Sequence, residues 1–544
     1  MRKLLLLLLL PAASKAQSKN NADLLIQNAT IYTADSAWHT YQAMAITNGR
    51  IAALGSNKEI NSKYTSVKNI NAKGKFIYPG FIDAHCHFSG YALDKYKCEL
   101  EGTKSFEEVV KKLVAYEKTN ELSWIYGRGW DQNKWTIKEF PTKDTLDKLF
   151  PDKPVILKRI DGHALLCNEK ALQLAHIDVH TTIEGGVVEK KNGELTGILI
   201  DNAMTPVENL IPALPQAQAV KYLVAAQNDC YKLGLTYVID CGVKKDVINI
   251  LKNLYDNNTL SIGNALLVAD DEPTLDAFVK QGPVDYGQLK IAGIKMYADG
   301  ALGSRGASLI EDYTDKPGHR GTLLSPVSHF KDIAALALQY HWQLCTHAIG
   351  DNANRQILNV YAEALGGKND LRWRIEHCQV VDPADIHLFG DYSVIPSVQP
   401  THATSDMPWA INRLGAKRLP HAYAFKDLLL QNGWIALGTD FPVEEINPLN
   451  TFYAAVYRKD KKGNPPAGFL PENALTKKEA LQGMTIWAAK SIFSEKQKGS
   501  LETGKDADLI ILDTDIMKSS QANTLKTKVL YTIVKGKIVY QAIK

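Results

Sequence analysis

Two histidines two positions apart are the first residues in this sequence that could do chemistry. His85 and His87 lie in the run FIDAHCHF, whose apolar residues favour a strand. Because side chains alternate across a strand, both imidazoles point to one face and Cys86 points to the other. Two imidazoles on one face at a strand end suit a divalent transition metal, with zinc as the first candidate.

Four more candidate residues belong to later strand-like runs. His347 stands in LCTHAIGD, His377 in WRIEHCQ and Asp440 in ALGTDFP, while Lys295 stands in IAGIKMYADG. Most of the spacings are close to multiples of the roughly 30 residues that one β/α unit occupies, and the step from Lys295 to His347 fits one unit with an enlarged loop. Histidine and aspartate are ordinary zinc ligands, so these side chains predict a metal centre where the strand ends converge.

The elements that must position these residues alternate in type along the chain. Strand-like runs are followed by helical patterns, which is typical of parallel β/α architecture. Eight such runs, the number that a TIM barrel needs, stand at 76–87, 236–242, 264–270, 291–300, 343–350, 372–379, 394–400 and 434–442. A doubly wound open sheet would accept the same alternation. Polar residues at five strand ends favour the barrel, whose C-terminal mouth holds active sites.

Two parts of the chain lie outside this barrel pattern. The first two runs are much farther apart than one β/α unit, so we expect an insertion over about 98–215, after barrel strand 1. Both ends of the chain hold short β-like runs with hairpin turns, at Asn48-Gly49 and Lys535-Gly536. Neither end has enough strands for a stable sheet alone. We therefore predict a small β-sandwich domain from 22–75 plus 495–544, and a barrel over 76–494.

The first 16 residues are typical of a signal peptide. Arg2 and Lys3 precede the apolar run Leu4 to Leu10, and Ser14-Lys15-Ala16 offers a cleavage site before Gln17. We expect a periplasmic or secreted protein, a buried N-terminal helix being the alternative. No later stretch approaches the roughly 20 apolar residues that a membrane span needs. The net charge of +4 falls to about +1 without this segment, which gives no reason to expect a nucleic-acid partner.

The sequence resembles the amidohydrolase superfamily, and within it the YtcJ-like (amidohydrolase 3) branch. The resemblance covers essentially the whole chain after the signal segment. It rests on PGFIDAHCH at 79–87, GRGWDQNKW at 127–135, DGHALLCN at 161–168, IKMYADGALGSRGA at 294–307, THAIGDNA at 346–353, RIEHCQ at 374–379, SVQPTHATSD at 397–406, LGTDFPV at 437–443 and KGSLETGKDADLIILD at 498–513. The combination of these motifs is specific, whereas the H-x-H or the G-x-D elements alone would not be.

The resemblance implies a role for each candidate ligand. His85 and His87 would bind a first metal ion, and His347 and His377 a second. Lys295 resembles the bridging lysine of binuclear members, which carbon dioxide carboxylates to an anionic carbamate. The alternatives are an uncarboxylated Lys295 in a one-metal site, or a lysine that pairs with an acid such as Asp299. One or two divalent ions, zinc being favoured, are therefore expected.

The resemblance also implies a reaction. Asp440, itself within reach of the first metal, would be the general base that takes a proton from a metal-activated water and passes it to the leaving nitrogen. His163 matches a DGH motif of the branch and would contact the substrate or its carbonyl oxygen, although a structural role is open. Gln399 and His402, after strand seven, are candidate substrate-binding groups. Trp130 would wall an apolar pocket or pack in the core of the insertion.

The expected function is hydrolysis of a non-peptide C–N bond, in an amide or formamide-like small molecule, by an exported metal-dependent enzyme. A hydrolase of an ester or a cyclic amide is the first alternative. A catalytically silent metal-binding barrel with a regulatory role is the second, although a non-enzyme has no need for a base such as Asp440. Homo-oligomers are compatible with the sequence.

Overall fold

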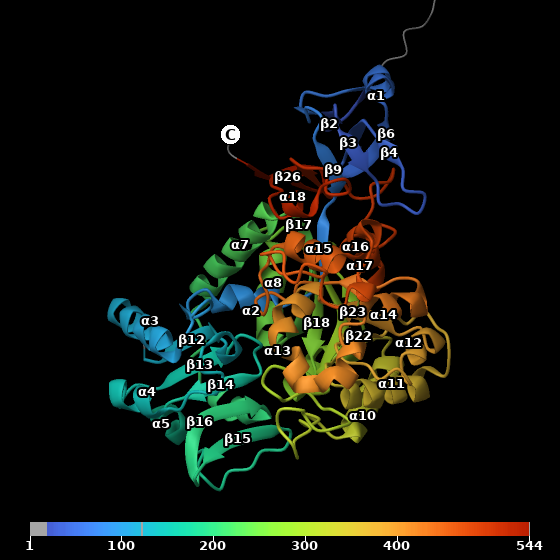
Figure 1. The fold of residues 1–544 in the computed structure, drawn as a ribbon. Helices are drawn as coiled ribbons and strands as arrows, with labels where there is room; N and C mark the ends of the chain where they lie inside the picture. Colours follow the sequence, from blue (N-terminus) through green and yellow to red (C-terminus); the bar gives the residue numbers. More distant parts are fainter. Residues whose placement is uncertain (1–18, 121–122, 543–544) are drawn as a thin grey trace, which may run out of the picture.

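A parallel β/α barrel forms the centre of the molecule (Figure 1). The computed structural model describes residues 19–120 and 123–542, so the predicted signal peptide lies outside the described residues. Eight parallel strands pair in chain order: β10 (Phe81–Cys86), β17 (Leu235–Val243), β18 (Gly263–Ala269), β20 (Leu289–Tyr297), β21 (Gln343–Ala348), β22 (Arg374–His377), β23 (Ile395–Val398) and β24 (Ala436–Leu437). Each of the eight runs predicted from the sequence contains one of these strands, and the predicted TIM barrel is confirmed. The first run, 76–87, also contains β9 (Phe76–Pro79), which pairs with β3 (Thr30–Tyr32) and β25 (Leu509–Leu512) outside the barrel, so this part of the run was wrongly assigned to the barrel.

The barrel closes where the last strand meets the first. The backbone N–H of Asp440, just after β24, donates to the carbonyl oxygen of His85 at 2.8 Å. The carboxylate of Asp83 in β10 accepts from the backbone N–H and the hydroxyl of Thr439 at 2.9 and 2.7 Å. A Cβ atom at Gly438 would lie 2.5 Å from the backbone nitrogen of His85, so this close approach of the strands requires glycine. Closure thereby fixes Asp440 beside His85.

Helices cover the outside of the barrel and bury one apolar side each. They include α7 (Gln216–Lys232), α8 (Lys245–Asp256), α10 (Val327–Gln339), α11 (Asp351–Leu365) and α14 (Phe425–Asn432). In α8, Ile248, Leu251 and Leu254 recur at helical spacing and are buried in the main core. Among the described residues, no helix is both long enough and apolar enough to cross a bilayer.

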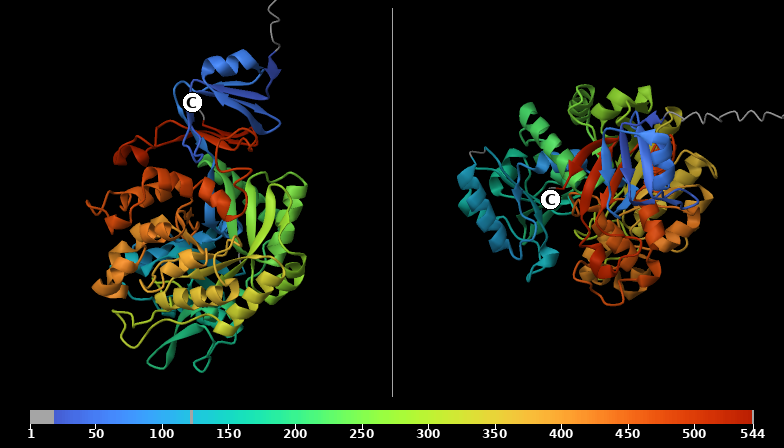
Figure 2. Two further views of the ribbon diagram at one scale, coloured as in Figure 1. Left: turned by 90° about the vertical axis from the view of Figure 1, so that its right-hand side faces the viewer. Right: turned by 90° about the horizontal axis from the view of Figure 1, so that it is seen from above.

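The insertion after barrel strand 1 forms a sheet of its own, with strand order β11-β12-β13-β14-β16-β15. Its strands are β11 (Cys98–Glu99), β12 (Ile125–Trp130), β13 (Val155–Arg159), β14 (Ala164–Cys167), β15 (Gly186–Lys191) and β16 (Glu194–Asp201). Helices α3 (Phe106–Thr119), α4 (Asp144–Leu149) and α5 (Glu169–Leu174) accompany it. The insertion lies beside the barrel, and β15 and β16 reach the end opposite the terminal strands (Figures 1 and 2). Its boundaries at 98 and 215 stay predictions.

Strands from both termini form the predicted β-sandwich. One sheet has the order β6-β5-β2-β8 and the other the order β27-β26-β25-β9-β3-β4. The first comprises β2 (Leu24–Gln27), β5 (Ala43–Thr47), β6 (Arg50–Gly55) and β8 (Asn69–Asn71). The second comprises β3 (Thr30–Tyr32), β4 (Thr40–Tyr41), β9 (Phe76–Pro79), β25 (Leu509–Leu512), β26 (Val529–Val534) and β27 (Lys537–Gln541).

The two ends of the chain are joined directly, because β25 pairs antiparallel with β9, Leu509 opposite Pro79. Side chains from both sheets share one core, which includes Ile26 and Ile46 from the first and Ile77 and Ile511 from the second. Strand β9 then continues through Gly80 into barrel strand β10. The sandwich therefore sits at the end where the barrel strands begin (Figure 2).

Candidate metal centre and active site

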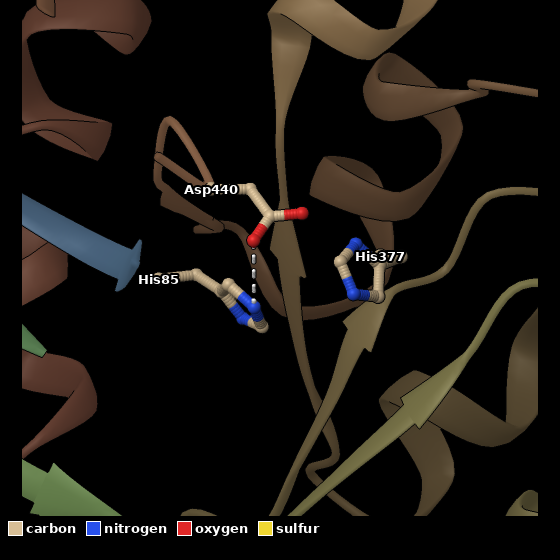
Figure 3. A group of neighbouring side chains, drawn as sticks. All are labelled: His85, His377 and Asp440. Carbon is tan, nitrogen blue, oxygen red and sulfur yellow. Dashed lines mark ion pairs between the residues drawn. The ribbon is translucent and has the colours of Figure 1, made fainter. Parts of the chain in front are cut away.

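Polar side chains from several strand ends meet at the C-terminal mouth of the barrel. Figure 3 shows the three that lie closest: His85 from the end of β10, His377 from the end of β22 and Asp440 after β24. One ligand atom from each of the three lies within 4.8 Å of the others, and all three residues are buried. The Nε2 atom of His85 is 3.5 Å from Oδ1 of Asp440. This spacing leaves room for one ion between them.

Glu376 holds the imidazole ring of His85 in a single tautomer through its Nδ1 atom. Its Nδ1 atom lies 2.6 Å from Oε2 of Glu376, whose Oε1 accepts from Arg374 at 2.5 Å. Burial opposes a charge on Glu376, but the Arg374 guanidinium outweighs it and holds the pKa of the carboxyl well below its usual range. A carboxylate can only accept, so Nδ1 carries the proton and the Nε2 lone pair of His85 points into the site.

The Nε2 lone pair of His85 has no hydrogen-bond partner in residues 19–120 and 123–542. Burial lowers the pKa of His85 to about 4, so the ring is neutral at pH 7. Within the described part of the chain, neither His85 Nε2 nor Asp440 Oδ1 makes a hydrogen bond. Burying unsatisfied polar atoms costs free energy, and here two electron-rich atoms face each other. A divalent cation between them satisfies both, so the donor set fits a metal ion.

The rings of His377 and His87 are oriented in the same way as His85, by an acceptor at Nδ1. Nδ1 of His377 lies 2.7 Å from Oε1 of Gln399, and Nδ1 of His87 lies 3.0 Å from the carbonyl oxygen of Cys241. An acceptor fixed at Nδ1 leaves Nε2 free in each ring. Nε2 of His87 is 3.2 Å from Oδ1 of Asp440, so His87 stands beside the group of three.

Asp440 adopts a conformation that most residues avoid. Its φ is 63°, in the left-handed region, and such residues cluster at functional sites. Its second carboxylate oxygen, Oδ2, lies 3.1 Å from Nε2 of His402. Burial opposes the charge, but the hydrogen bond from His402 and the proximity of His87 hold the pKa of Asp440 well below its usual range. Asp440 is therefore an anion in the site.

Lys295 lies in the barrel interior and forms no ion pair with any of the described residues. The register places it opposite Cys345, two residues deeper than His347. Among the described residues, none accepts a hydrogen bond from its buried Nζ, which lies 4.8 Å from the ring centre of Tyr297. Asp299 is not its partner, because that carboxylate accepts the backbone N–H groups of Ser308, Ile349 and Gly350.

His347 lies next to the group of three but outside it. Its ring centre is 4.6 Å from that of His377 and 5.1 Å from that of His163. Its Nε2 atom faces the carbonyl oxygen of Gly300 at 3.5 Å. The two histidines that the resemblance assigns to a second ion are therefore neighbours, while His377 also shares the closer group with His85 and Asp440.

A small cavity opens in front of these residues. Its volume is about 100 Å³, and His163, His347, His377, His402 and Asp440 line it. His163 comes from the insertion, where its Nδ1 lies 2.8 Å from Oδ1 of Asp201. Burial alone would lower the pKa of His163, but the hydrogen bond to Asp201 outweighs it and raises the pKa above its ordinary value. The insertion therefore completes the wall of a site built on the barrel.

The remaining predicted substrate-binding residues lie in different surroundings. His402 lines the cavity between Asp440 and Glu444, 3.1 Å from a carboxylate oxygen of each. Gln399 is buried behind His377 and holds that ring instead of facing the cavity.

The prediction that Trp130 walls the pocket is corrected by its position. Trp130 is buried in the core of the insertion, its indole N–H donates to the carbonyl oxygen of Leu157, and it does not line the cavity. The ring of Trp130 packs against the rings of Trp135 and Phe140, and this packing accounts for a tryptophan at position 130. The packing alternative stated for Trp130 is the one that its surroundings support.

Three residues of the site were not singled out from the sequence. They are Glu376, which holds His85, Asp201, which holds His163, and Glu444, which holds His402. Glu376 had a signal, because it is a charged residue beside His377 inside a buried strand, where charges occur only when paired. Asp201 and Glu444 are separated from their partners by 38 and 42 positions, so local pattern does not reveal them.

Comparison with known proteins gives the same assignment across the whole chain. Residues 68–540 match the model of the Amidohydrolase family. The putative amidohydrolase YtcJ of Bacillus subtilis (strain 168) is 31% identical over 524 residues, which cover 94% of this chain and 98% of that protein. The N-substituted formamide deformylase of Arthrobacter pascens is 26% identical over 544 residues, covering 95% of this chain and 98% of that protein.

A solved structure is similar over almost the same extent. An uncharacterized metal-dependent hydrolase from Pyrococcus horikoshii OT3 superposes with a TM-score of 0.74 at 28% sequence identity, covering 92% of this chain and 99% of that one. The barrel, the converging ligand atoms and the match from residue 68 to 540 agree. This chain belongs to the Amidohydrolase family.

Proposed function

We propose that the protein is an exported metal-dependent hydrolase that cleaves a non-peptide C–N bond in a small amide, with N-substituted formamides as the first class to test. The observation that carries this proposal is the convergence of His85 Nε2 and Asp440 Oδ1, two buried atoms without a partner among the described residues, at the mouth of the barrel. The similarity to a formamide deformylase supports the choice of substrate class.

The ligands of one ion would be His85, His87, His377 and Asp440. A second ion would lie toward His347 and Lys295. In that case Nζ of Lys295 adds to carbon dioxide and loses a proton, which gives an anionic carbamate. The buried Nζ of Lys295, from which none of the described residues accepts a hydrogen bond, supports this step, because a buried charged group without a direct partner is costly. A bound zinc ion would supply Lewis-acid polarisation of the carbonyl group and would make a nearby water more acidic.

The side chains of the cavity would then move the protons. Asp440 accepts a proton as water attacks the carbonyl carbon, and returns it to the leaving nitrogen when the C–N bond breaks. His402 binds the Oδ2 atom of Asp440 and thereby orients the carboxylate. His163, whose pKa Asp201 raises, donates from Nε2 to the carbonyl oxygen, where negative charge develops.

Activity on a defined panel tests this proposal. Protein loaded with zinc and bicarbonate is assayed on N-alkylformamides, N-alkylacetamides, cyclic amides and esters with matched alkyl groups. We expect amine release from the formamides and a loss of at least about 100-fold in Asp440→Asn, since general base catalysis contributes 10²–10⁴-fold. Ions are counted in both proteins, because Asp440 also contacts the metal site.

Two results would contradict the proposal. Preference for the esters or the cyclic amides moves the assignment to that alternative. Failure on every compound, together with tight binding of one of them, favours the silent binding barrel.

Export is tested separately by N-terminal sequencing of the protein recovered from cells, which should begin at Gln17.

A further inference from the structure

Asp201 connects the insertion to the barrel at the point where His163 enters the cavity. It ends strand β16, and its side chain is only 1% exposed. Its carboxylate lies 2.8 Å from Nδ1 of His163, and its backbone N–H donates to the carbonyl oxygen of the same residue at 3.1 Å. The histidine is therefore held by Asp201 through both its ring and its backbone.

The barrel leaves space for this carboxylate in the loop that follows β20. A Cβ atom at Gly300 would lie 2.3 Å from Oδ2 of Asp201, and a Cβ atom at Gly306 would lie at the same distance from that oxygen. Neither glycine has a positive φ, so the turn itself does not require glycine at either position. The close approach of Asp201 explains why both residues lack a side chain.

The backbone of Asp201 is itself in an unfavourable conformation, with φ 52° and ψ −126°. Non-glycine residues hold such angles only where the surroundings impose them, and they gather at functional sites. Here the surroundings are two glycines on one side and a cavity-lining histidine on the other. Geometry, packing and backbone strain thus point to the same residue.

We propose that Asp201 is a positioning residue that directs Nε2 of His163 into the cavity. Because Asp201 binds Nδ1, Nε2 is the ring atom left to contact a substrate beside His347. The inference rests on the proposed function for the identity of that substrate. It also assigns a function to the insertion, since the packing of Asp201 against Gly300 and Gly306 sets the position of His163 relative to the barrel residues.

A double-mutant cycle tests whether Asp201 acts through His163. Asp201→Asn, His163→Ala and the double variant are assayed on an N-alkylformamide, with zinc content and melting temperature measured in parallel. We expect Asp201→Asn to lower kcat by about 10- to 100-fold, the range known for carboxylates that orient metal-binding histidines, with KM and zinc content close to wild type. The double variant should be no slower than His163→Ala alone.

The matched control is Asp152→Asn, an exposed aspartate of the insertion, which should behave as wild type. A further loss of rate when Asp201→Asn is added to His163→Ala would overturn the inference, because a residue with only a structural role acts in either background. An unchanged kcat in Asp201→Asn would overturn it as well.

Gly306→Ala reaches the same contact from the barrel side. Its new methyl group must displace the Asp201 carboxylate, so it should lower kcat as Asp201→Asn does, and it should add little in an Asp201→Ala background.

Crystal structures of wild type and Asp201→Asn provide a readout that does not need a substrate. A His163 ring that turns away or loses order supports the inference, and a ring that stays in place contradicts it. If wild type hydrolyses nothing in the panel, the proposed function fails while this structural test still decides the role of Asp201.

Discussion

Single residues decide whether the mouth of the barrel can hold a metal ion, and Glu376 is the clearest case. It is fully buried, accepts from Nδ1 of His85 and is neutralised by Arg374. The glutamine side chain of Glu376→Gln has the same shape as glutamate. Its amide N–H₂ can turn toward His85, however, and the proton of that ring is then no longer fixed on Nδ1. We expect zinc affinity to fall by about 10- to 100-fold, as for other partners of metal-binding histidines.

The measurement for Glu376→Gln is a zinc competition titration against a chelator. Glu363→Gln is the matched control, since Glu363 lies in α11 with a 64% exposed side chain and pairs only with Lys331 among the described residues. Equal zinc affinity in wild type and Glu376→Gln would show that the ion pair behind His85 does not orient a ligand.

The sequence predicted the atoms that face the site better than the atoms that support them. His85, His377 and Asp440 were identified because each ends a strand-like run. Glu376 was not, because its partner His85 lies 291 positions away and only the closed barrel brings them together. For Trp130 the sequence left a pocket wall and core packing both open, because an aromatic residue near a motif gives no sign of which way it faces.

Asp240 in strand β17 should make the stability of the protein depend on pH. Burial raises the pKa of Asp240 to about 6, although the backbone N–H of Ser89 donates to it. A carboxyl group with a raised folded pKa favours folding at low pH, and this contribution is lost as pH rises through about 6. Each pKa unit is worth about 1.4 kcal/mol. Between pH 4 and pH 7 the free energy of unfolding of Asp240→Asn should therefore rise by about 3 kcal/mol relative to that of wild type.

Urea unfolding of both proteins across this pH range measures the difference. Asp256→Asn, at an exposed aspartate at the end of α8, is the control and should track wild type. A constant difference between Asp240→Asn and wild type at pH 4 and pH 7 would mean that Asp240 titrates alike in the folded and unfolded chains.

The barrel strands could be predicted because each is a short apolar run with a local pattern. What local pattern does not give is the order of the insertion sheet, where β16 passes between β14 and β15. That order carries Asp201 to the barrel loop, so a contact central to the site depends on pairing between strands rather than on any motif. The closure at Gly438 is also a property of the complete barrel.

At the scale of the whole molecule, the two ends of the chain depend on each other. A chain that ends after Ser494 lacks β25, which leaves the apolar strand β9 without its antiparallel partner. Exposed edges of this kind promote aggregation, so we expect this chain to be insoluble. Size-exclusion chromatography of the soluble fraction measures this outcome.

A chain that ends after Val534 is the graded control, because it loses only the edge strand β27 and keeps the pairing of β25 with β9. It should remain largely soluble. A soluble and fully active chain ending after Ser494 would contradict the joint role of the termini.

The central claim is that the converging strand ends form a metal centre. X-ray diffraction at the zinc absorption edge, from crystals of protein incubated with zinc and bicarbonate, tests this claim most directly. We predict an anomalous peak within bonding distance of His85 Nε2 and Asp440 Oδ1, and a weaker or absent peak at that position in crystals of His85→Ala. No peak at the mouth of the barrel, or zinc bound only at the surface, would contradict the account.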